Sequence, residues 1–577
     1  MDDRTYHVPR QVGPNIFPAH PFFNRLVRFA HAVPPRLCVR DDNTGVEATH
    51  VQLLTDVLAF RERVLASLSP AVRQQLDNRE EVYIAILAAG GYEYTVATLA
   101  ALAVGAAVVP MTVALPPEEA LYFVTKSRAV SVLCSSAAME LGKAVEKLVK
   151  GQDSGSSFTC LNVAPSLHNT PLHPSEIKMS SDQYLSDNAP GVVIFTSGTT
   201  GPPKGAVMRR GFIHDTALAV ADHYNLGPSD TMLHLLPVHH ATGIGLNFFP
   251  GLISGCVLEF KSGSFSAEWT WERWRRGGIT VFSGVPTIYM RMMRYFEQKL
   301  ASKANVTEYL QGAREIKACL CGTSALPKPI ADFWAQILGK RIVLRYGATE
   351  FGAVFKVRLG DENVPDGSVG NLFAGCDVKL RNEETGEDGN EGEVIVRSGA
   401  GEMFSKYIWD PDATAKAHTP DGYYRTGDIA REENGYYWIL GRASIDIIKS
   451  GGYKISALDI EREILALPYV AEVMVVGVAD LEFGERVAAA VVLKEPEDQK
   501  DEPITNLSLE KLRQDLRARL AGYKMPTILR LIKGELPKSG TGKVVKKVLG
   551  PQFFPKNYLE MKEVQAWTPQ EVQKAKL

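Results

Sequence analysis

A regular alternation of strand and helix patterns is the feature that most restricts how this chain can fold. From residue 82 the expected order is strand (82–87), helix (94–104), strand (107–110), helix (117–126) and strand (131–134). Alternation of this kind is typical of a parallel sheet covered by helices. Further strand patterns follow between residues 232 and 345, so an α/β fold is expected for most of the chain.

The length and the changing patterns predict more than one domain. A chain of 577 residues exceeds the size at which a single core keeps growing. We expect a large N-terminal domain of parallel sheets covered by helices at 1–441, which begins with a peripheral helical segment at 1–80. Short strands separated by Gly, Asn and Asp predict a β-rich subdomain at about 368–441. A hinge (442–446), a small mobile α+β C-terminal domain (447–555) and a polar tail (556–577) complete the expected organisation.

Charge, cysteines and hydropathy exclude several classes of protein. The formal net charge of -2 provides no electrostatic reason to expect a nucleic-acid partner. The seven cysteines form no C-x-x-C pair, which favours a reducing compartment over a disulfide framework or a structural zinc site. The first residues show no secretory or mitochondrial address. The most apolar run, 96–111, is broken by Gly105 and Pro110 and predicts helix, turn and strand, not a membrane span.

A loop rich in glycine and hydroxyl residues follows the apolar run at 192–195. It reads Thr-Ser-Gly-Thr-Thr-Gly-Pro-Pro-Lys-Gly, over which the Walker pattern cannot be laid. Glycines let backbone N–H groups approach the oxygens of a polyphosphate, hydroxyls add donors and a lysine adds charge. A plain surface turn would need neither the lysine nor the hydroxyls. The candidate phosphate contacts are Thr196, Ser197, Gly198, Thr199, Thr200, Gly201 and Lys204.

This loop matches throughout the T-S-G-T-T-G-x-P-K-G pattern of the adenylate-forming superfamily, which the sequence resembles over about residues 82–550. The superfamily contains acyl-CoA synthetases, luciferases and the adenylation domains of peptide synthetases. The resemblance implies an ATP-dependent enzyme that activates a carboxylic acid. Its other motifs follow in order: Leu-Pro-Val-His-His (236–240), Cys-Gly-Thr-Ser-Ala (321–325), Arg-Tyr-Gly-Ala-Thr-Glu (345–350), Tyr-Arg-Thr-Gly-Asp (424–428) and Pro-Lys-Ser-Gly-Thr-Gly-Lys (537–543).

The resemblance implies an ATP site at the ends of these strands. Glu350 supplies the hard oxygen that a phosphate-bound Mg²⁺ prefers, and Asp428 is implied to accept hydrogen bonds from both ribose hydroxyls. The other implied contacts are Gly322 and Thr323 around the adenine, Tyr346 stacked on the adenine, Gly347 and Thr349 beside the substrate, and Arg442 at the ribose.

Lys543, in a glycine-flanked loop, is the implied catalytic lysine. When a carboxylate attacks the α-phosphate of ATP, two anions repel each other, and a cation between them lowers that cost. A small hinged domain would let this lysine leave once the acyl-adenylate exists. His240 is implied to be a further catalytic residue that lines the acyl channel, and His239 stands where the family has an aromatic residue.

Gly451, Gly452, Tyr453 and Lys454 resemble the face that binds the thiol substrate. One extra residue separates Arg442 from Asp446 compared with most relatives, so the hinge residue is left open between Ser444 and Ile445. Coenzyme A is the favoured thiol, because no carrier domain follows. The alternatives are a stand-alone adenylation enzyme that loads a carrier protein and a nucleotide sensor that has lost catalysis. The presence of Lys543 and Glu350 disfavours the sensor.

The acid is a separate question. Residues 284–291 and 344–347, together with the extra residue before Asp446, look most like the malonyl-CoA synthetase branch, in which basic groups hold a second carboxylate. Arg291 and Arg345 are the residues carried over, since a buried anion needs a paired, hydrogen-bonded cation. Thr242 departs from that branch, and Arg291 also fits a solvated helix position. Malonate or another short polar acid is expected, with a medium-chain or aromatic acid as the alternative.

The chain ends Ala575-Lys576-Leu577, a close variant of the peroxisomal Ser-Lys-Leu address. We therefore expect recognition by the peroxisomal import receptor, with a cytoplasmic location as the alternative.

Overall fold

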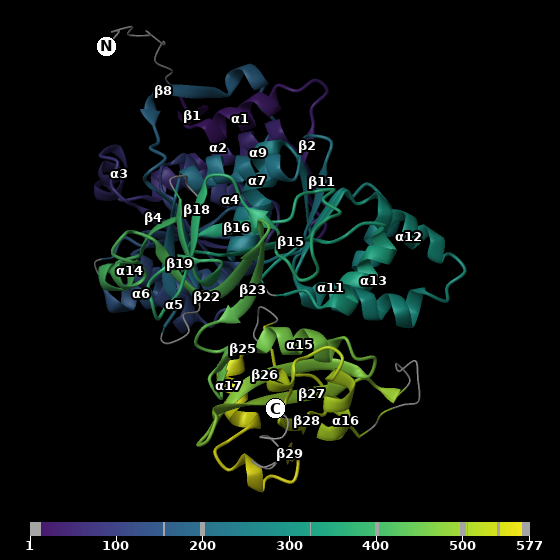
Figure 1. Ribbon diagram of the computed structural model, residues 1–577. Helices are drawn as coiled ribbons and strands as arrows, with labels where there is room; N and C mark the ends of the chain where they lie inside the picture. The colour runs from purple at the N-terminus through teal and green to yellow at the C-terminus, as the bar shows by residue number, and fades with distance from the viewer. Residues whose placement is uncertain are drawn as a thin grey trace.

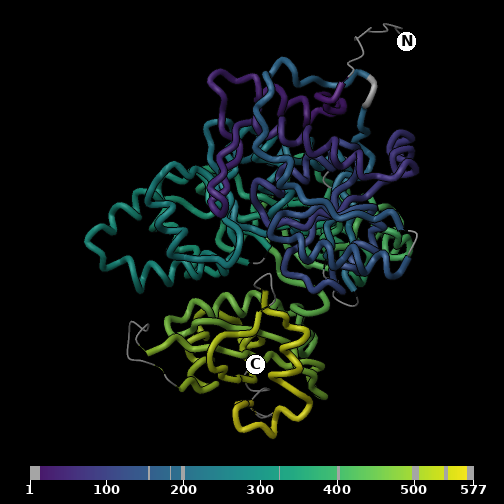
Figure 2. The backbone as a smooth tube through the Cα atoms, turned by 180° about the vertical axis from the view of Figure 1, so that it is seen from behind, coloured from purple at the N-terminus to yellow at the C-terminus, as the bar shows by residue number. Residues whose placement is uncertain are grey.

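The chain folds into two bodies, seen from opposite sides in Figures 1 and 2. The computed structural model describes residues 13–153, 156–196, 202–323, 325–398, 403–496, 504, 506–538 and 543–567. The larger body contains parallel and mixed sheets with helices, and the smaller one begins with the strand at Ile447. The expected α/β class, with a large N-terminal and a smaller C-terminal domain, is confirmed.

Within the described residues, one sheet of the larger body has seven strands in the order β21-β10-β9-β5-β4-β6-β7. The strands from β9 to β7 are parallel, whereas β10 and β21 are antiparallel to their neighbours. The alternation from residue 82 therefore forms the parallel sheet that it predicts. The strands are β4 (Tyr83–Leu87), β5 (Ala107–Met111), β6 (Ser131–Cys134), β7 (Thr159–Asn162), β9 (Pro190–Thr196), β10 (Lys204–Arg209) and β21 (Phe404–Tyr407).

A second sheet has nine described strands in the order β17-β16-β15-β14-β13-β11-β12-β2-β3, parallel from β15 to β2. The expected peripheral helical segment at 1–80 is helical only in part, because it also contributes strands, and β2 pairs Val39 with Leu258 in this sheet. The strands are β2 (Leu37–Asp41), β3 (Val46–Thr49), β11 (Thr231–His234), β12 (Val257–Phe260), β13 (Val281–Gly284), β14 (Ala318–Cys321), β15 (Val343–Ala348), β16 (Gly352–Lys356) and β17 (Asn371–Leu372); β1 (Ile16–Ala19) pairs separately with β8 (Lys178–Tyr184).

Helix α4 (Tyr92–Ala103) lies between the two large sheets, in contact with β4 and β5 of one and β2 of the other. All its residues except Glu93 are buried, as a helix that is apolar on every side requires. No helix within the described ranges is long and apolar enough to cross a membrane. The other helices of this body are α1 (Pro21–Ala30), α2 (His50–Ser67), α3 (Pro70–Asp77), α5 (Pro117–Ser127), α6 (Met139–Gln152), α7 (Ala217–His223), α8 (Ala241–Gly243), α9 (Phe249–Ser254), α10 (Ala267–Arg275), α11 (Pro286–Tyr295), α12 (Val306–Glu315), α13 (Lys328–Leu338) and α14 (Pro411–Lys416).

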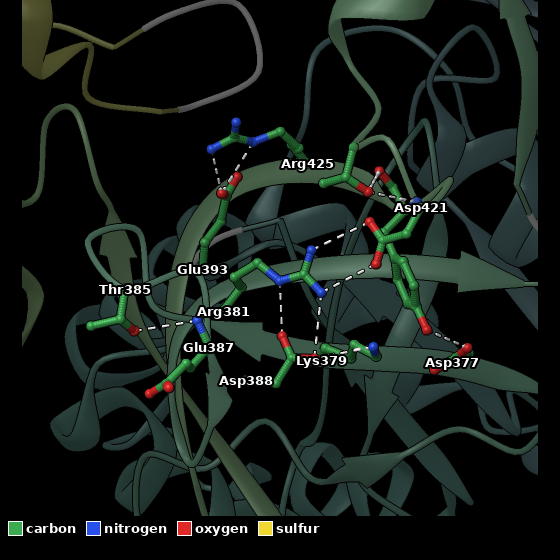
Figure 3. Close-up of polar contacts among 11 residues, drawn as sticks. Asp377, Lys379, Arg381, Thr385, Glu387, Asp388, Glu393, Asp421 and Arg425 are labelled. Carbon is green, nitrogen blue, oxygen red and sulfur yellow. Dashed lines mark hydrogen bonds and ion pairs between the residues drawn. The ribbon is translucent and has the colours of Figure 1, made fainter.

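The β-rich subdomain is an antiparallel sheet in the order β19-β18-β20-β22-β23. Its outer surface is held by polar pairs between strands and turns: Figure 3 shows the guanidinium of Arg381 between Asp388, at 2.8 Å, and Asp421, at 3.2 Å. β22 and β23 carry residues of the ATP motifs toward the parallel sheets. The strands are β18 (Cys376–Arg381), β19 (Asp388–Gly389), β20 (Glu391–Ser398), β22 (Tyr424–Glu433) and β23 (Tyr436–Arg442).

The smaller body is an α+β unit whose sheet has the order β25-β24-β27-β28-β29, with β26 beside β27. Alternate residues of β27 face two separate apolar clusters, one containing Ala489 and Val491 and the other Ala488 and Ala490. The elements are β24 (Ile447–Ser450), β25 (Tyr453–Ser456), α15 (Ala457–Leu465), β26 (Val470–Asp480), β27 (Gly484–Leu493), α16 (Leu509–Leu516), β28 (Ile528–Leu531), α17 (Lys546–Phe553) and β29 (Val564–Ala566).

Candidate functional site

Glu350 lies where the ends of the two large sheets meet. The residue follows β15 and is buried, and its Oε1 accepts hydrogen bonds from the Tyr407 hydroxyl at 3.0 Å and the Thr196 hydroxyl at 3.4 Å. Thr196 ends β9, and the ammonium of Lys204, at the start of β10, is 5.1 Å from the centre of the Tyr407 ring. The two ends of the predicted phosphate loop are thus brought to Glu350. Ser197, Gly198, Thr199, Thr200 and Gly201 lie outside the described residues.

Asp428 contacts two other predicted ATP residues, Tyr346 and Arg442. Its Oδ2 accepts a hydrogen bond from the Tyr346 hydroxyl at 2.7 Å, and its Oδ1 is 3.0 Å from Nε of Arg442. Burial raises the pKa of Asp428, and Arg442 and Tyr346 oppose that rise. Each carboxylate oxygen can accept a second hydrogen bond, so the implied ribose contacts remain compatible with this pairing.

One face of the Tyr346 ring stacks on Phe355, with centroids 5.5 Å apart and planes inclined by 22°. An adenine ring would therefore have to stack on the opposite face. Thr349 lies half-buried in the turn that follows β15.

The glycines of these motifs are explained by close contacts within the protein. A Cβ atom on Gly347 would lie 1.8 Å from the carbonyl oxygen of Gly352, because β15 and β16 pair there. A Cβ atom on Gly322 would lie 3.1 Å from Cγ of Arg345. The next residue, Thr323, has a φ of 73°, in the left-handed region that a residue with a Cβ seldom adopts.

His239 and His240 follow β11 with their rings 4.3 Å apart. Burial lowers the pKa of His239 to about 3. Burial and the nearby charge of Lys543 also lower the pKa of His240. Both imidazoles are therefore neutral at pH 7.

Lys543 comes from the smaller body yet lies within electrostatic reach of His240, Asp428 and Arg442. The residue is exposed to solvent. Loss of solvation and the charge of Arg442 lower the pKa of its ammonium, while Asp428 opposes the shift. The predicted lysine is thus gathered with the residues of the large body that the motifs single out.

Arg345 is buried on β15, only 5% exposed. Its Nη2 donates to Oγ of Ser283, on β13, at 2.9 Å. Its Nε and Nη1, and the hydroxyl of the buried Tyr224, have no hydrogen-bond partner among the described residues. Burial raises the pKa of Tyr224, and both the charge of Arg345 and a side-chain contact with it oppose the rise. The hydroxyl and the guanidinium are therefore close neighbours, although no hydrogen bond of normal geometry joins them.

Arg291, by contrast, is exposed on α11. The predicted pair of arginines is therefore not assembled as a buried pair, because a helix turns its charged side chains to solvent when its apolar face packs inward.

The predicted coenzyme A face lies on the exposed turn between β24 and β25. Gly451 and Gly452 adopt positive φ values of 55° and 84° there. Tyr453 stacks on Tyr523, with centroids 4.4 Å apart, and the ammonium of Lys454 is 2.8 Å from Glu384 of the β-rich subdomain.

Three residues of this region were missed by the motif reasoning. Tyr407, Tyr224 and Ser283 stand in stretches that carry no ATP motif, and long-range packing brings them to Glu350 and Arg345. No local sequence signal could have found them.

Comparison with known proteins identifies the family. Residues 65–408 match the AMP-binding enzyme family, and residues 459–543 match its C-terminal domain. A probable CoA ligase of Humulus lupulus is 34% identical over 488 residues, covering 81% of this chain and 79% of the relative. The mitochondrial malonate–CoA ligase of Bos taurus is 32% identical over 509 residues, covering 83% and 82%. The chain therefore belongs to the AMP-binding enzyme family, and the resemblance to adenylate-forming enzymes is confirmed.

Comparison with a solved structure supports the fold. ATP-bound MatB from Rhodopseudomonas palustris superposes with a TM-score of 0.75 at 24% identity, over 93% of this chain and 99% of MatB.

The contact between Tyr407 and Glu350 leads to a prediction. Tyr407→Phe removes a hydrogen bond to a carboxylate, worth roughly 1.5–3 kcal/mol. We expect about tenfold lower kcat/KM for MgATP, with a higher Mg²⁺ concentration needed for half-maximal rate, as measured by steady-state kinetics over a Mg²⁺ series.

Tyr423→Phe is the matched control, because the Tyr423 hydroxyl donates to Asp377 in the β-rich subdomain, at 2.7 Å. An unchanged Mg²⁺ dependence in Tyr407→Phe would show that this hydroxyl does not orient Glu350.

Proposed function

We propose that this chain is an ATP-dependent acyl-CoA ligase. In the first step a carboxylic acid and MgATP form an acyl-adenylate and pyrophosphate, and in the second the thiol of coenzyme A displaces AMP. Membership of the AMP-binding enzyme family and similarity to proteins named CoA ligases over four-fifths of the chain support this reaction. The observation that carries it is that Lys543, from the smaller body, lies within electrostatic reach of Asp428 and Arg442.

The charges of the site suit the first step. A protonated Lys543 would lie between the attacking carboxylate and the α-phosphate and reduce their repulsion. Neutral His239 and His240 would line the approach of the acid without adding charge.

Glu350 offers one carboxylate, and no group of three or more acidic, His or Cys side chains that could hold a metal occurs among the described residues. One carboxylate suits Mg²⁺, which in nucleotide sites is bound chiefly by phosphate oxygens and water and supplies charge neutralisation there.

Lys543→Ala tests this assignment. Loss of the cation should slow acid-dependent pyrophosphate exchange by a factor of about 10² or more. Formation of acyl-CoA from supplied acyl-adenylate should proceed at the parent rate, because the second step does not require this lysine. The two half-reactions are measured separately. Acyl-adenylate formation at the parent rate would remove Lys543 from the mechanism.

For the acid, we propose a short dicarboxylate such as malonate. Of the three nitrogens of the buried Arg345 guanidinium, Nη2 donates to Ser283, and Nε and Nη1 have no hydrogen-bond partner among the described residues, so none of them bonds an acidic side chain there. A buried, unpaired charge costs several kcal/mol, and a carboxylate bound against the guanidinium would supply the counter-charge. The relative from Bos taurus is named a malonate–CoA ligase, which agrees with this acid. A medium-chain or aromatic acid is the alternative.

Arg345→Met should lower kcat/KM for malonate by about 10²-fold, equivalent to roughly 2.7 kcal/mol, and leave hexanoate little changed or improved. Kinetics with malonate, methylmalonate, hexanoate and benzoate provide the comparison. Arg291→Ala, at the exposed position, shows whether the other predicted arginine contributes. A parent enzyme that prefers the monoacids, with the same ranking in Arg345→Met, would rule out the dicarboxylate.

We propose separately that Ala575-Lys576-Leu577 acts as a peroxisomal import signal. These residues lie outside the described ranges, and the proposal rests on their similarity to Ser-Lys-Leu. A fluorescent reporter that ends in residues 568–577 should become punctate and coincide with peroxisomes. The same reporter without 575–577 should stay diffuse, and a diffuse signal from both would reject the proposal.

A further inference from the structure

Three charged side chains form a largely covered cluster that has no role in the chemistry described above. The ammonium of Lys546, at the start of α17, is 2.6 Å from Oδ1 of Asp446 and 2.8 Å from Oε1 of Glu461. The three side chains are 11%, 13% and 14% exposed. Burial opposes the charge of Lys546, but the two carboxylates outweigh it and raise the pKa of this lysine. The cluster is therefore charged and closely paired in the fold.

The two carboxylates belong to different parts of the smaller body. Glu461 lies on α15 and accepts a hydrogen bond from the backbone N–H of Val475, on β26, at 2.7 Å. Asp446 ends the predicted hinge, and its carbonyl accepts from the N–H of Ala457, at the start of α15, at 2.7 Å. Asp446 is thus attached to the smaller body by its bond to Ala457 and by its ion pair with Lys546.

The other end of the hinge is attached to the larger body. The N–H of Ala443 donates to the carbonyl of Gly427, on β22, at 3.0 Å, and Arg442 pairs with Asp428. Between these attachments stand Ser444, which is exposed, and Ile445, which is half-buried. The carbonyl of Arg442 accepts from the N–H groups of Ile445, at 3.1 Å, and Asp446, at 2.8 Å, and the N–H of Arg442 donates to Oδ2 of Asp446, at 3.0 Å. A rotation between the bodies that is taken up at Ser444 and Ile445 would have to rearrange this hydrogen-bonded turn.

Lys546 also stands three residues after Lys543. Lys538, which precedes Lys543 in the same motif, forms an isolated antiparallel β-bridge with Val544. Its ammonium is 2.7 Å from Glu472 of β26. Since three residues span at most about 10 Å, holding Lys546 restricts how far Lys543 can move relative to α15.

We propose that Lys546 is a positioning residue for the adenylation step. By pairing with Asp446 and Glu461, it makes the end of the hinge, α15 and Lys543 move as one rigid unit, so that rotation at Ser444 and Ile445 delivers Lys543 to the site. This inference rests on the proposed function of Lys543.

The test uses variants of the full chain. In Lys546→Met, two buried carboxylates lose their counter-charge, so the triple variant Lys546→Met, Asp446→Asn, Glu461→Gln is made as well to remove the ion pairs without an unpaired charge. Lys546→Arg keeps the positive charge. Lys547→Met is the matched control, since Lys547 is the exposed next residue of the same helix.

Two half-reactions are measured for each variant: acid-dependent pyrophosphate exchange, and acyl-CoA formation from supplied acyl-adenylate. We use the acid that the parent enzyme prefers among malonate, methylmalonate, hexanoate and benzoate. We expect exchange to fall by about tenfold or more in the triple variant, with thioester formation near the parent rate. Lys546→Arg should restore exchange, Lys547→Met should match the parent, and the loss should vanish in a Lys543→Ala background.

Equal losses in both half-reactions, or the same loss with and without Lys543, would show a purely structural cluster and overturn the inference. A parent enzyme that exchanges pyrophosphate with none of the acids would overturn the proposed function, and the inference with it. Thermal unfolding of each variant separates loss of fold from loss of positioning.

Discussion

The carboxylate of Asp428 is the interaction on which the site depends. A buried carboxylate is stable only when it is paired and hydrogen-bonded. Asp428 meets this requirement with Tyr346, from the end of a parallel sheet, and Arg442, from the last strand of the β-rich subdomain. The charge of Lys543, from the smaller body, also favours the ionised form of Asp428. The single carboxylate of Asp428 therefore interacts with the end of a parallel sheet, with the β-rich subdomain and with Lys543. These are the parts of the protein that a bound nucleotide would touch.

Two buried charged groups in this protein are satisfied to different degrees. Lys546 has both of its carboxylates within 2.8 Å, whereas Arg345 has one hydrogen bond and two N–H groups without partners. Buried polar groups in native proteins are nearly always paired. A complete cluster is suited to holding elements together, and an incomplete one is suited to receiving a ligand. From this contrast we propose that Lys546 acts in the movement of the smaller body and that Arg345 acts in recognition of the acid.

The orientation of the smaller body fits the first of the two proposed steps. Lys543 lies near Asp428, while Lys454, on the proposed coenzyme A face, pairs with Glu384 in the β-rich subdomain. Exposed ion pairs such as this are worth only about 0–1 kcal/mol. The Lys454–Glu384 pair between the bodies can therefore form and break during a reaction cycle. The Lys546 pairs, which are shielded from solvent, are expected to persist.

The sequence by itself determined the α/β class, the alternation of strands and helices from residue 82, and the motif residues that meet at Glu350 and Asp428. These follow from periodic patterns and from stretches of a few residues. Only the tertiary structure placed β2 in the large sheet, brought Tyr407 to Glu350, exposed Arg291 and left Arg345 buried with unsatisfied donors. The reason is physical: a contact between residues far apart in the chain leaves no period in the local sequence, and whether a charge is buried depends on every element packed around it.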